Sequence, residues 1–308
     1  MKGGIHVNAQ QFILDDIERT TVSPYEELLA YEYLYSRKGE SLRRLSDATV
    51  KKGILPSRLL EERVGLFGID GDYDEMAAYI NSKLGKCSFA VNGAYGWPEK
   101  LKDSARPTPV LYYRGDLGLV ESKSVSIVGA REASDAGMSR AHAAAKKLME
   151  ADVTIVTGLA KGVDTAAAKA VAQSNGKGRM IGVIGTPIDE YYPRENRQLQ
   201  DWAAERNLLL SQVPFYKYKI QPFTSKRNYF PERNELMAAV SDATVIVEAS
   251  DRSGVLHQAK ACLHMGRPLF IMRSCAENPA VSWPSRFIGK PGVQTLDDIS
   301  QVLEAISA

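Results

Sequence analysis

The chain has 308 residues, of which 44% are apolar and 25% charged, so it can form one large or two medium-sized globular domains. Its net charge of +2 excludes a protein whose whole surface attracts nucleic acid, so such a partner would need a local basic patch. Three widely spaced cysteines exclude a disulfide framework, and no apolar run is long enough for a membrane span or a signal peptide. We therefore expect a cytoplasmic protein without a membrane partner.

Residues 1–115 predict a smaller, mainly helical N-terminal domain that ends in a connector. Ser23 and Pro24 begin a helix rich in Leu, Ala and Tyr, since proline suits the first helical turn. The connector, 93–116, is rich in Pro and Gly and ends in a short apolar strand. Because large apolar side chains such as Trp97 favour burial, we expect the connector to be ordered.

Residues 116–308 predict a second domain with an α/β fold. Short β-branched apolar runs alternate with helical patterns, which is typical of a parallel sheet covered by helices on both faces. The sequence therefore predicts a doubly wound, mostly parallel sheet. An amphipathic segment near the C-terminus predicts a last helix that packs on it. The apolar runs are 124–130, 153–158, 180–185, 207–212, 243–249 and 268–272.

The loop after the first apolar run combines a glycine with a cation. Gly129 allows a tight turn, Arg131 supplies positive charge, and Ser134 or Asp135 can cap the helix that follows. The free N–H groups at the start of that helix favour a bound anion. A plain strand-to-helix turn with a solvated arginine explains the same residues equally well, so both interpretations remain open.

The loop after the second run also has small residues and a cation. Gly158 and Gly162 flank it, and Lys161 lies between them ahead of an alanine-rich helix. Close approach of a ligand and tight helix packing explain these glycines equally well. NAD is not expected, because the first loop has one glycine and the second strand ends at Thr157 without a carboxylate for a ribose. We expect no cofactor.

A third candidate for a phosphate-binding loop follows the run 243–249. It lies directly before a helical pattern, where free N–H groups and the helix dipole favour an anion. The two histidines of that pattern, His257 and His264, have no third metal ligand nearby, so no metal site is expected. The loop contains Arg252, Ser253 and Gly254.

A basic and aromatic stretch covers 215–234. Five basic and six aromatic side chains share these twenty positions, and only Glu232 opposes the positive charge. Cations that contact phosphates and rings that stack on bases are the combination found in sites for single-stranded nucleic acid. A loop of lysines lying over a few core aromatics is the alternative that the stretch alone leaves open.

Seven motifs in order resemble the DNA-processing protein A (DprA/Smf) family. They lie between residues 124 and 272, and GWPEKLKDSARPTPVLYYRGD upstream is similar to the segment that precedes the family's core. The motifs are SIVGAR, TGLAKGVDxAA, VIGTxxDxxYPxEN, LSQxP, YFPERN, VIVEASxxSGxLxQA and GRPLF.

This resemblance implies an extended Rossmann-like fold and a protein that binds single-stranded DNA without catalysis. It also implies a homodimer that passes strands to a RecA-type recombinase in natural transformation or DNA recombination. Because the chain ends soon after the last motif, we expect no C-terminal winged helix, which many members carry. Departures from the family motifs, such as Gln212 and Val255, leave a role in phage or plasmid defence open.

By motif position, the resemblance also assigns a site. Arg131 corresponds to the arginine that grips phosphate, Arg227 to the basic residue ahead of the YFPERN motif, and Phe230 to the ring that stacks on a base. The glycine loop 158–162 would line the same pocket, and Lys226 adds charge beside Arg227.

A nucleotide-binding protein is the alternative from another class. Phosphoribohydrolases with a related Rossmann variant carry a carboxylate after their glycine loop, but residues 253–261 contain none. Without a general acid or base, hydrolysis is not expected. Nucleotide sensing without turnover remains open.

Overall fold

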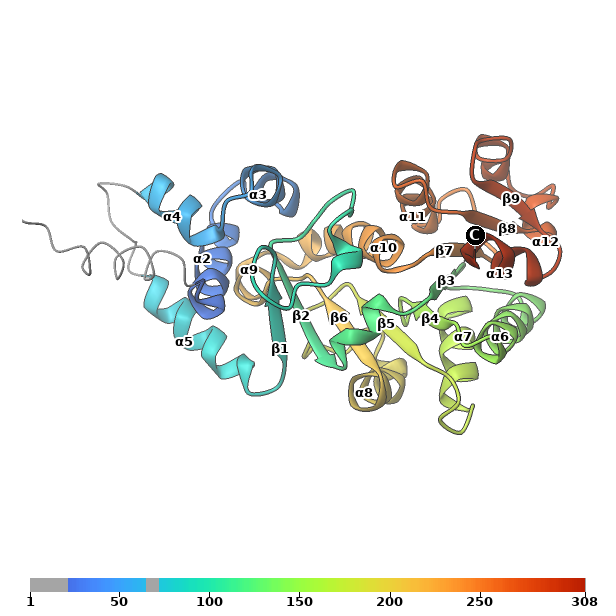
Figure 1. Cartoon of the computed structure of the whole chain (residues 1–308), viewed down its shortest axis with the longest axis horizontal. Coiled ribbons are helices and arrows are strands. Elements are labelled where there is room, and N and C mark those ends of the chain that lie inside the picture. Colours follow the sequence, from blue (N-terminus) through green and yellow to red (C-terminus); the bar gives the residue numbers. More distant parts are fainter. Residues whose placement is uncertain (1–21, 65–71, 308) are drawn as a thin grey trace, which may run out of the picture.

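The computed structural model of the chain describes residues 22–64 and 72–307. Within these residues the strands form one nine-stranded sheet in the order β1-β2-β6-β5-β4-β3-β7-β8-β9 (Figure 1). The pairs from β6 to β9 are parallel, and β1 and β2 are antiparallel. The predicted doubly wound, mostly parallel sheet is confirmed. Its strands are β1 (Ser88–Val91), β2 (Val110–Gly115), β3 (Ser124–Val128), β4 (Thr154–Thr157), β5 (Met180–Ile184), β6 (Leu208–Ser211), β7 (Ala243–Ile246), β8 (Leu269–Met272) and β9 (Val293–Leu296).

Helices cover both faces of the parallel part. Figure 1 shows α6 (Asp135–Glu150), α7 (Val163–Ala172) and α8 (Arg197–Arg206) on one side of the sheet. On the other side lie α10 (Tyr229–Val240) and α11 (Val255–His264). This two-sided cover explains why the strands read as almost continuous apolar runs.

The central strand β3 shows how its residues serve both layers. Val125 and Ile127 are buried in a core that includes Ala141 of α6. Val128 is buried in a second core, which includes Leu236 of α10. Because successive side chains of a strand point to opposite faces, one short run supplies both cores.

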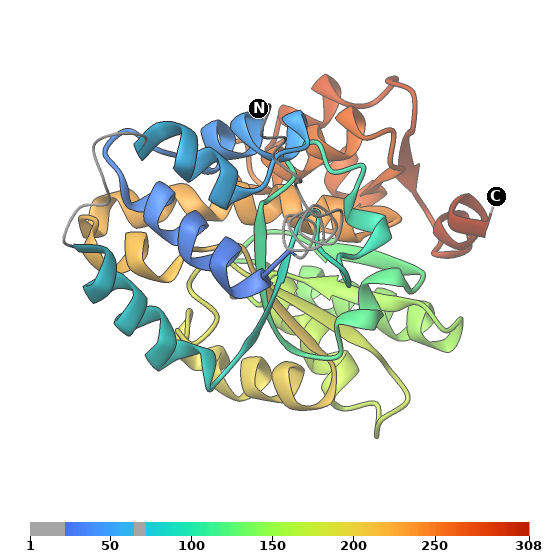
Figure 2. The same ribbon diagram turned by 60° about the vertical axis from the view of Figure 1, so that its left-hand side comes forward.

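Before the sheet the described chain is helical, as predicted. The side-chain oxygen of Ser23 accepts a hydrogen bond from Glu26 N and caps the first helix. Residues 1–21 and 65–71, which also belong to the predicted N-terminal domain, lie outside the described residues. The elements are α2 (Pro24–Ser36), α3 (Leu42–Ala48), η1 (Val50–Lys52), α4 (Pro56–Val64) and α5 (Asp72–Leu84), seen together in Figure 2.

A buried carboxylate joins this helical region to the sheet. Glu32 of α2 accepts hydrogen bonds from the backbone N–H groups of Phe215 (2.8 Å) and Tyr216 (3.0 Å) at the start of α9 (Phe215–Ile220). The hydroxyl of Tyr112 in β2 also donates to Glu32, at 2.5 Å. Burial raises the pKa of Glu32 to about 7, although these hydrogen bonds favour its charged form.

The connector belongs to the sheet, because β2 pairs with β6. The division into two domains after residue 115 stays a prediction. Strands β1 and β9 were not predicted, and β9 takes the beginning of the segment expected to be the last helix, α13 (Ser300–Ser307). Within the described ranges, no helix is long and apolar enough to cross a membrane. The remaining elements are η3 (Glu99–Leu101), η4 (Leu117–Glu121), η5 (Arg194–Asn196), η6 (Phe223–Asn228), α12 (Arg273–Ala276) and η7 (Trp283–Arg286).

Candidate nucleic-acid interface

The sheet reverses its direction of growth at β3. From β3 the chain adds β4, β5 and β6 on one side, and it later adds β7, β8 and β9 on the other. The loops after β3 and β7 therefore diverge at the carboxyl edge, where open α/β sheets bind their ligands. Ala130 N donates a 2.6 Å hydrogen bond to Glu248 O and holds the two loops side by side.

A pocket of about 550 Å³ lies at this point. Its walls come from the loops after β3 and β7 and from the first turns of α10 and α11. The structure therefore brings together side chains that are more than a hundred positions apart in the sequence. Six of the predicted site residues line it: Gly129, Arg131, Phe230, Arg252, Ser253 and Gly254.

Arg131 and Phe230 lie side by side in the wall of this pocket. The Arg131 guanidinium carbon lies 5.3 Å from the centroid of the Phe230 ring. The centroids of the Phe230 and Tyr192 rings are also 5.3 Å apart. The Phe230 ring lies against Gly185, where a Cβ atom would be 2.7 Å from it. Among the described residues, neither Arg131 nor Arg252 has an ion-pair partner, and both are exposed. These cations are thus available to an anionic ligand.

Gly158 lies beneath the pocket and not in its wall. Arg233 Nη1 donates hydrogen bonds to the carbonyl oxygens of Gly158 (2.5 Å) and Val183 (2.9 Å). A Cβ atom at Gly158 would be 1.9 Å from that nitrogen and 2.7 Å from a carboxylate oxygen of Asp164. Glycine is therefore required by the close approach of Arg233 and Asp164, which agrees with the packing interpretation of this loop.

Asp164 and Arg233 are both buried. Burial raises the pKa of Asp164, and the positive charge of Arg233 opposes that rise. Burial also lowers the pKa of Arg233 to about 10, against the effect of Asp164. Each charge is thus partly compensated by the other, which is the condition for keeping charges inside a protein.

The loop after β3 is fixed by a helix cap. Ser134 caps α6 as predicted, with its hydroxyl oxygen accepting from Gly137 N at 3.0 Å. The same hydroxyl donates to Glu248 at 2.7 Å, and Ser134 N donates to the other oxygen of that carboxylate at 3.2 Å. Glu248 therefore accepts from one backbone N–H group at this helix start, and the Ser134 hydroxyl accepts from another.

Three hydrogen bonds, made by the side chains of Asn234 and Asp251, hold the loop that carries Arg252. The Asn234 side-chain amide donates to Gly254 O at 2.9 Å. Asp251 accepts from Ser282 N at 3.0 Å and from Trp283 N at 2.7 Å. Asn234 therefore has a structural role, and Arg252 lies on an anchored loop.

Besides Gly158, four other predicted site residues lie outside the pocket. Lys161 and Gly162 line a neighbouring groove between α7 and α8. Lys226 Nζ lies 4.0 Å from the centroid of the Tyr218 ring. Arg227, on η6, is exposed and has no ion pair among the described residues.

The basic and aromatic stretch divides into two parts. Its first part, α9, faces the N-terminal helices. Lys217 Nζ donates to Ser36 O and Arg37 O. Lys219 pairs with Glu75 at 3.3 Å. Phe215, Tyr216 and Tyr229 are buried, so for them the core interpretation is right. Only the second part, with Phe223 (83% exposed), Lys226, Arg227 and Phe230, keeps side chains available to a ligand.

Three residues of the site region were not predicted. Asp164 lines the pocket, Glu248 organises its edge, and Tyr192 packs its ring on Phe230. The positions of the two acids in the sequence could have indicated them. Asp164 lies at the start of a predicted helix, and Glu248 lies near the end of the apolar run 243–249. Tyr192, which is 48% exposed, lies in the loop between β5 and η5.

Known proteins are similar to the part of the chain that contains these site residues. The model of the family described as DNA recombination-mediator protein A matches residues 88–307. The DNA processing protein DprA of Streptococcus pneumoniae is 36% identical over 184 residues, which are 59% of this chain and 61% of that protein. The DprA of Bacillus subtilis is 31% identical over 211 residues, 67% of this chain and 68% of its own length. The match to the Streptococcus pneumoniae protein thus spans less than two thirds of that protein's length.

Two solved structures have the same architecture. DprA of Streptococcus pneumoniae superposes with a TM-score of 0.66 at 25% identity and covers 99% of this chain and 98% of its own. DNA processing protein A of Helicobacter pylori, described for its single-stranded DNA binding mode, gives a TM-score of 0.60 at 22% identity. It covers 72% of this chain and 97% of its own. These likenesses confirm the extended Rossmann-like fold.

Proposed function

Since this chain belongs to the DNA recombination-mediator protein A family, we propose that it binds single-stranded DNA at the pocket around Arg131 and Phe230. The observation that carries the proposal is their juxtaposition: an exposed guanidinium without an ion-pair partner in the described chain lies 5.3 Å from a ring that forms the pocket wall. A cation for phosphate beside a face for a base is what a single strand needs.

The second wall of the pocket supplies the rest of the interface. Arg252 adds an exposed cation, and the backbone of Ser253 and Gly254 approaches the pocket without large side chains. Phosphate binds well at such loops ahead of helices. Lys226 and Arg227 extend the positive surface along the segment that leads to Phe230.

The protein acts without catalysis in this proposal. Of the carboxylates that line the pocket, Asp164 is buried, opposes Arg233 and accepts a 3.4 Å hydrogen bond from Ala160 N. A carboxylate used in this way is not free to act as a general base for water. Glu132 is the other, on the exposed loop after β3.

The biological role follows from the family. We propose that the chain, as a homodimer, passes single strands to a RecA-type recombinase in natural transformation or DNA recombination. The Helicobacter pylori relative, which has the same fold and is described as binding single-stranded DNA, supports the first step.

Fluorescence anisotropy over a salt series tests the binding step. The probes are a labelled single-stranded oligonucleotide and the matched duplex, each with the wild-type protein and with Arg131→Ala combined with Phe230→Ala. We expect preference for the single strand, a log–log salt slope of about −0.7 per phosphate contacted, and loss of binding in the double variant. No binding of the single strand at low salt would overturn the proposal.

A free nucleotide is the second candidate ligand, because about 550 Å³ is within the range of small-molecule pockets. It would use the same cations and the same ring. A shallow salt slope together with competition by mononucleotides would favour nucleotide sensing over strand binding.

A further inference from the structure

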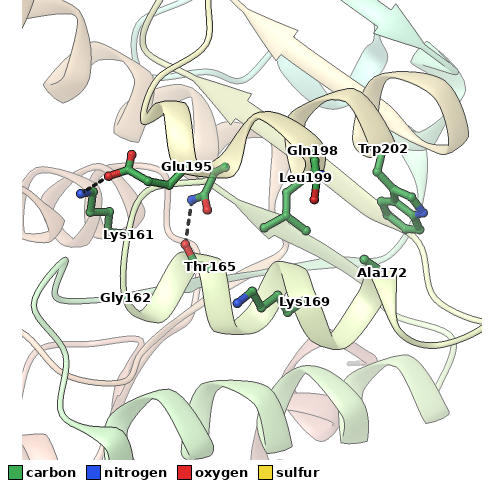
Figure 3. A pocket seen from close by; sticks show the side chains of 10 residues that line it. Lys161, Gly162, Thr165, Lys169, Ala172, Glu195, Gln198, Leu199 and Trp202 are labelled. Atoms are coloured by element: carbon green, nitrogen blue, oxygen red, sulfur yellow. Dashed lines mark hydrogen bonds and ion pairs between the residues drawn. The ribbon is translucent and has the colours of Figure 1, made fainter.

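A groove of about 610 Å³ lies beside the pocket, between α7 and α8. Figure 3 shows Lys169 of α7 opposite Leu199 and Trp202 of α8, with Lys161 at the end where α7 begins. Leu199 and Trp202 are partly exposed, and Lys161 and Lys169 are exposed. The groove thus combines two cations with an indole face, the same chemistry that the pocket has.

Tyr192 and the loop at Gly162 lie where the groove and the pocket adjoin. Tyr192 packs on Phe230 with a centroid distance of 5.3 Å, and 48% of its surface is exposed. It lies near Lys161, whose pKa is raised mainly by Glu195 and to a smaller extent by Tyr192. Gly162 backs onto the loop of Arg131, where a Cβ atom would be 2.2 Å from Ala130 O. The segment 160–165 contributes lining residues to both cavities and forms a wall between them.

We infer that the groove is a second subsite for the same single strand and binds the nucleotides that leave the pocket over Tyr192. This inference rests on the proposed function. Trp202 provides the face on which a base stacks, and Lys161 and Lys169 contact phosphates. A strand crossing from Phe230 past Tyr192 to Trp202 meets an aromatic ring on each side of the wall. Alternating rings and cations are the usual track of a single strand.

The charges of the groove set how it would respond to a strand. Lys161 pairs with Glu195 at 2.6 Å, and both side chains are more than half exposed. Exposed ion pairs are weak, so a phosphate can replace Glu195 as the partner of Lys161. Lys169 has no ion pair within the described part of the chain. Removing the charge of Glu195 should therefore strengthen binding in the groove.

The tryptophans provide a direct signal for this subsite. Trp97 is 8% exposed and Trp283 fully buried, whereas Trp202 is partly exposed in the groove. A base stacked on Trp202 should quench its fluorescence, while the two buried indoles should respond little. The variant Trp202→Phe keeps a ring for packing and stacking but removes the signal.

The experiment compares a single strand of about four nucleotides with one of about twelve, lengths that bracket typical site sizes. The full-length protein is titrated with each, and tryptophan fluorescence and anisotropy are recorded together. We expect both strands to bind through the pocket, but only the longer one to quench Trp202. The quench should vanish in Trp202→Phe while the affinity stays.

Three variants and a matched control assign the contacts. Trp202→Leu, which keeps apolar packing, should weaken the long strand by about fivefold or more, the factor for one lost stacked base, and leave the short strand unchanged. Lys169→Ala should lower the salt slope for the long strand by about 0.7. Glu195→Gln should tighten the long strand. Lys123 is an exposed lysine ahead of β3, at the opposite edge of the sheet. As the control, Lys123→Ala should change the affinity of neither strand.

The outcomes separate this inference from the proposed function. Equal binding of both strands without quenching would overturn the groove subsite and leave the pocket as the DNA site. Binding of neither strand would overturn the proposed function and the inference with it. Loss of long-strand binding in Trp202→Leu but not in Lys169→Ala, with unchanged unfolding midpoints, would reduce the subsite to the stacking contact and overturn the phosphate contact.

Discussion

Arg233 Nη1 donates a 2.5 Å hydrogen bond to the carbonyl oxygen of Gly158. This contact ties the first turns of α10, which carry Phe230, to the loop after β4. The same nitrogen also donates to Val183 O at 2.9 Å. One side chain therefore fixes the position of α10 relative to β5 and the end of β4. The position of Phe230 over the pocket therefore depends on a buried arginine that does not face solvent.

Gly158→Ala should destabilise the protein and move Phe230. Its Cβ would be 1.9 Å from Arg233 Nη1, so the guanidinium must shift away from Asp164. Overpacking of a close contact costs about 1–3 kcal/mol, and separation of the buried charges adds to this. Urea denaturation should show a lower midpoint with an unchanged slope, together with weaker binding of single-stranded DNA.

Gly254→Ala is the matched control for that substitution. Its Cβ would find its nearest heavy atom, in Asn234, at 3.6 Å, which is an ordinary contact. We expect its unfolding midpoint to stay near the wild-type value. Equal stability of Gly158→Ala and wild type would contradict the role given to the Arg233 contact.

Arg131 and Phe230 should act as a coupled pair in DNA binding. The ring holds the guanidinium above the pocket at 5.3 Å, so Phe230→Ala removes a stacking face and also frees Arg131. A double-mutant cycle on single-strand affinity should give a coupling energy of about 0.5 kcal/mol or more. Phe230→Ala alone should cost about 1–3 kcal/mol, and strictly additive losses would show that the two residues work independently.

Glu32 should make stability depend on pH between about 4.5 and 7. Its pKa is 4.5 for an unperturbed glutamate and about 7 in the folded protein, so the folded state binds more protons in this range. Stability is then complete below the lower value and falls as pH rises through the higher one. The difference corresponds to about 3 kcal/mol of unfolding free energy, measured by denaturant titrations at a series of pH values.

Glu32→Gln should flatten this dependence without abolishing it. Glu232 also has a pKa raised to about 7 by burial and contributes a similar term. The variant should be less stable at low pH, because an amide cannot accept from both Phe215 N and Tyr216 N. Glu26→Gln, exposed on the same helix, is the control and should reproduce the wild-type profile. An unchanged profile in Glu32→Gln would refute the assignment.

Ser134→Ala should weaken the edge of the pocket. It removes the cap of α6 and the donor to Glu248, at a cost of about 1 kcal/mol for the cap alone. Thermal unfolding should show a lower midpoint, and hydrogen exchange should rise at Gly137 N. Ser134→Thr keeps the hydroxyl and should retain most of the stability. No change in Ser134→Ala would mean that another group caps α6.

The sequence by itself predicted the doubly wound sheet, the strand that ends the connector and the six strands of the apolar runs. Each of those strands is buried on both faces, so its residues are apolar almost without interruption and the pattern is local. It missed β1 and β9 because edge strands are half exposed and carry a mixed pattern: Ser88 and Gln294 are exposed residues of these two strands. Their pairing depends on β2 and β8, which no local pattern contains.

The candidate site was predicted in part for the same reason. Motif order placed Arg131, Phe230 and the loop of Arg252 at one edge, because strand ends of a parallel sheet meet there. Three-dimensional packing decided that Gly158 makes room for Arg233 and that Lys217 and Lys219 hold the N-terminal helices. Local composition determines which side chains can bind a strand. Which of them remain free to do so depends on burial and ion pairing between distant segments, and these exist only in the folded chain.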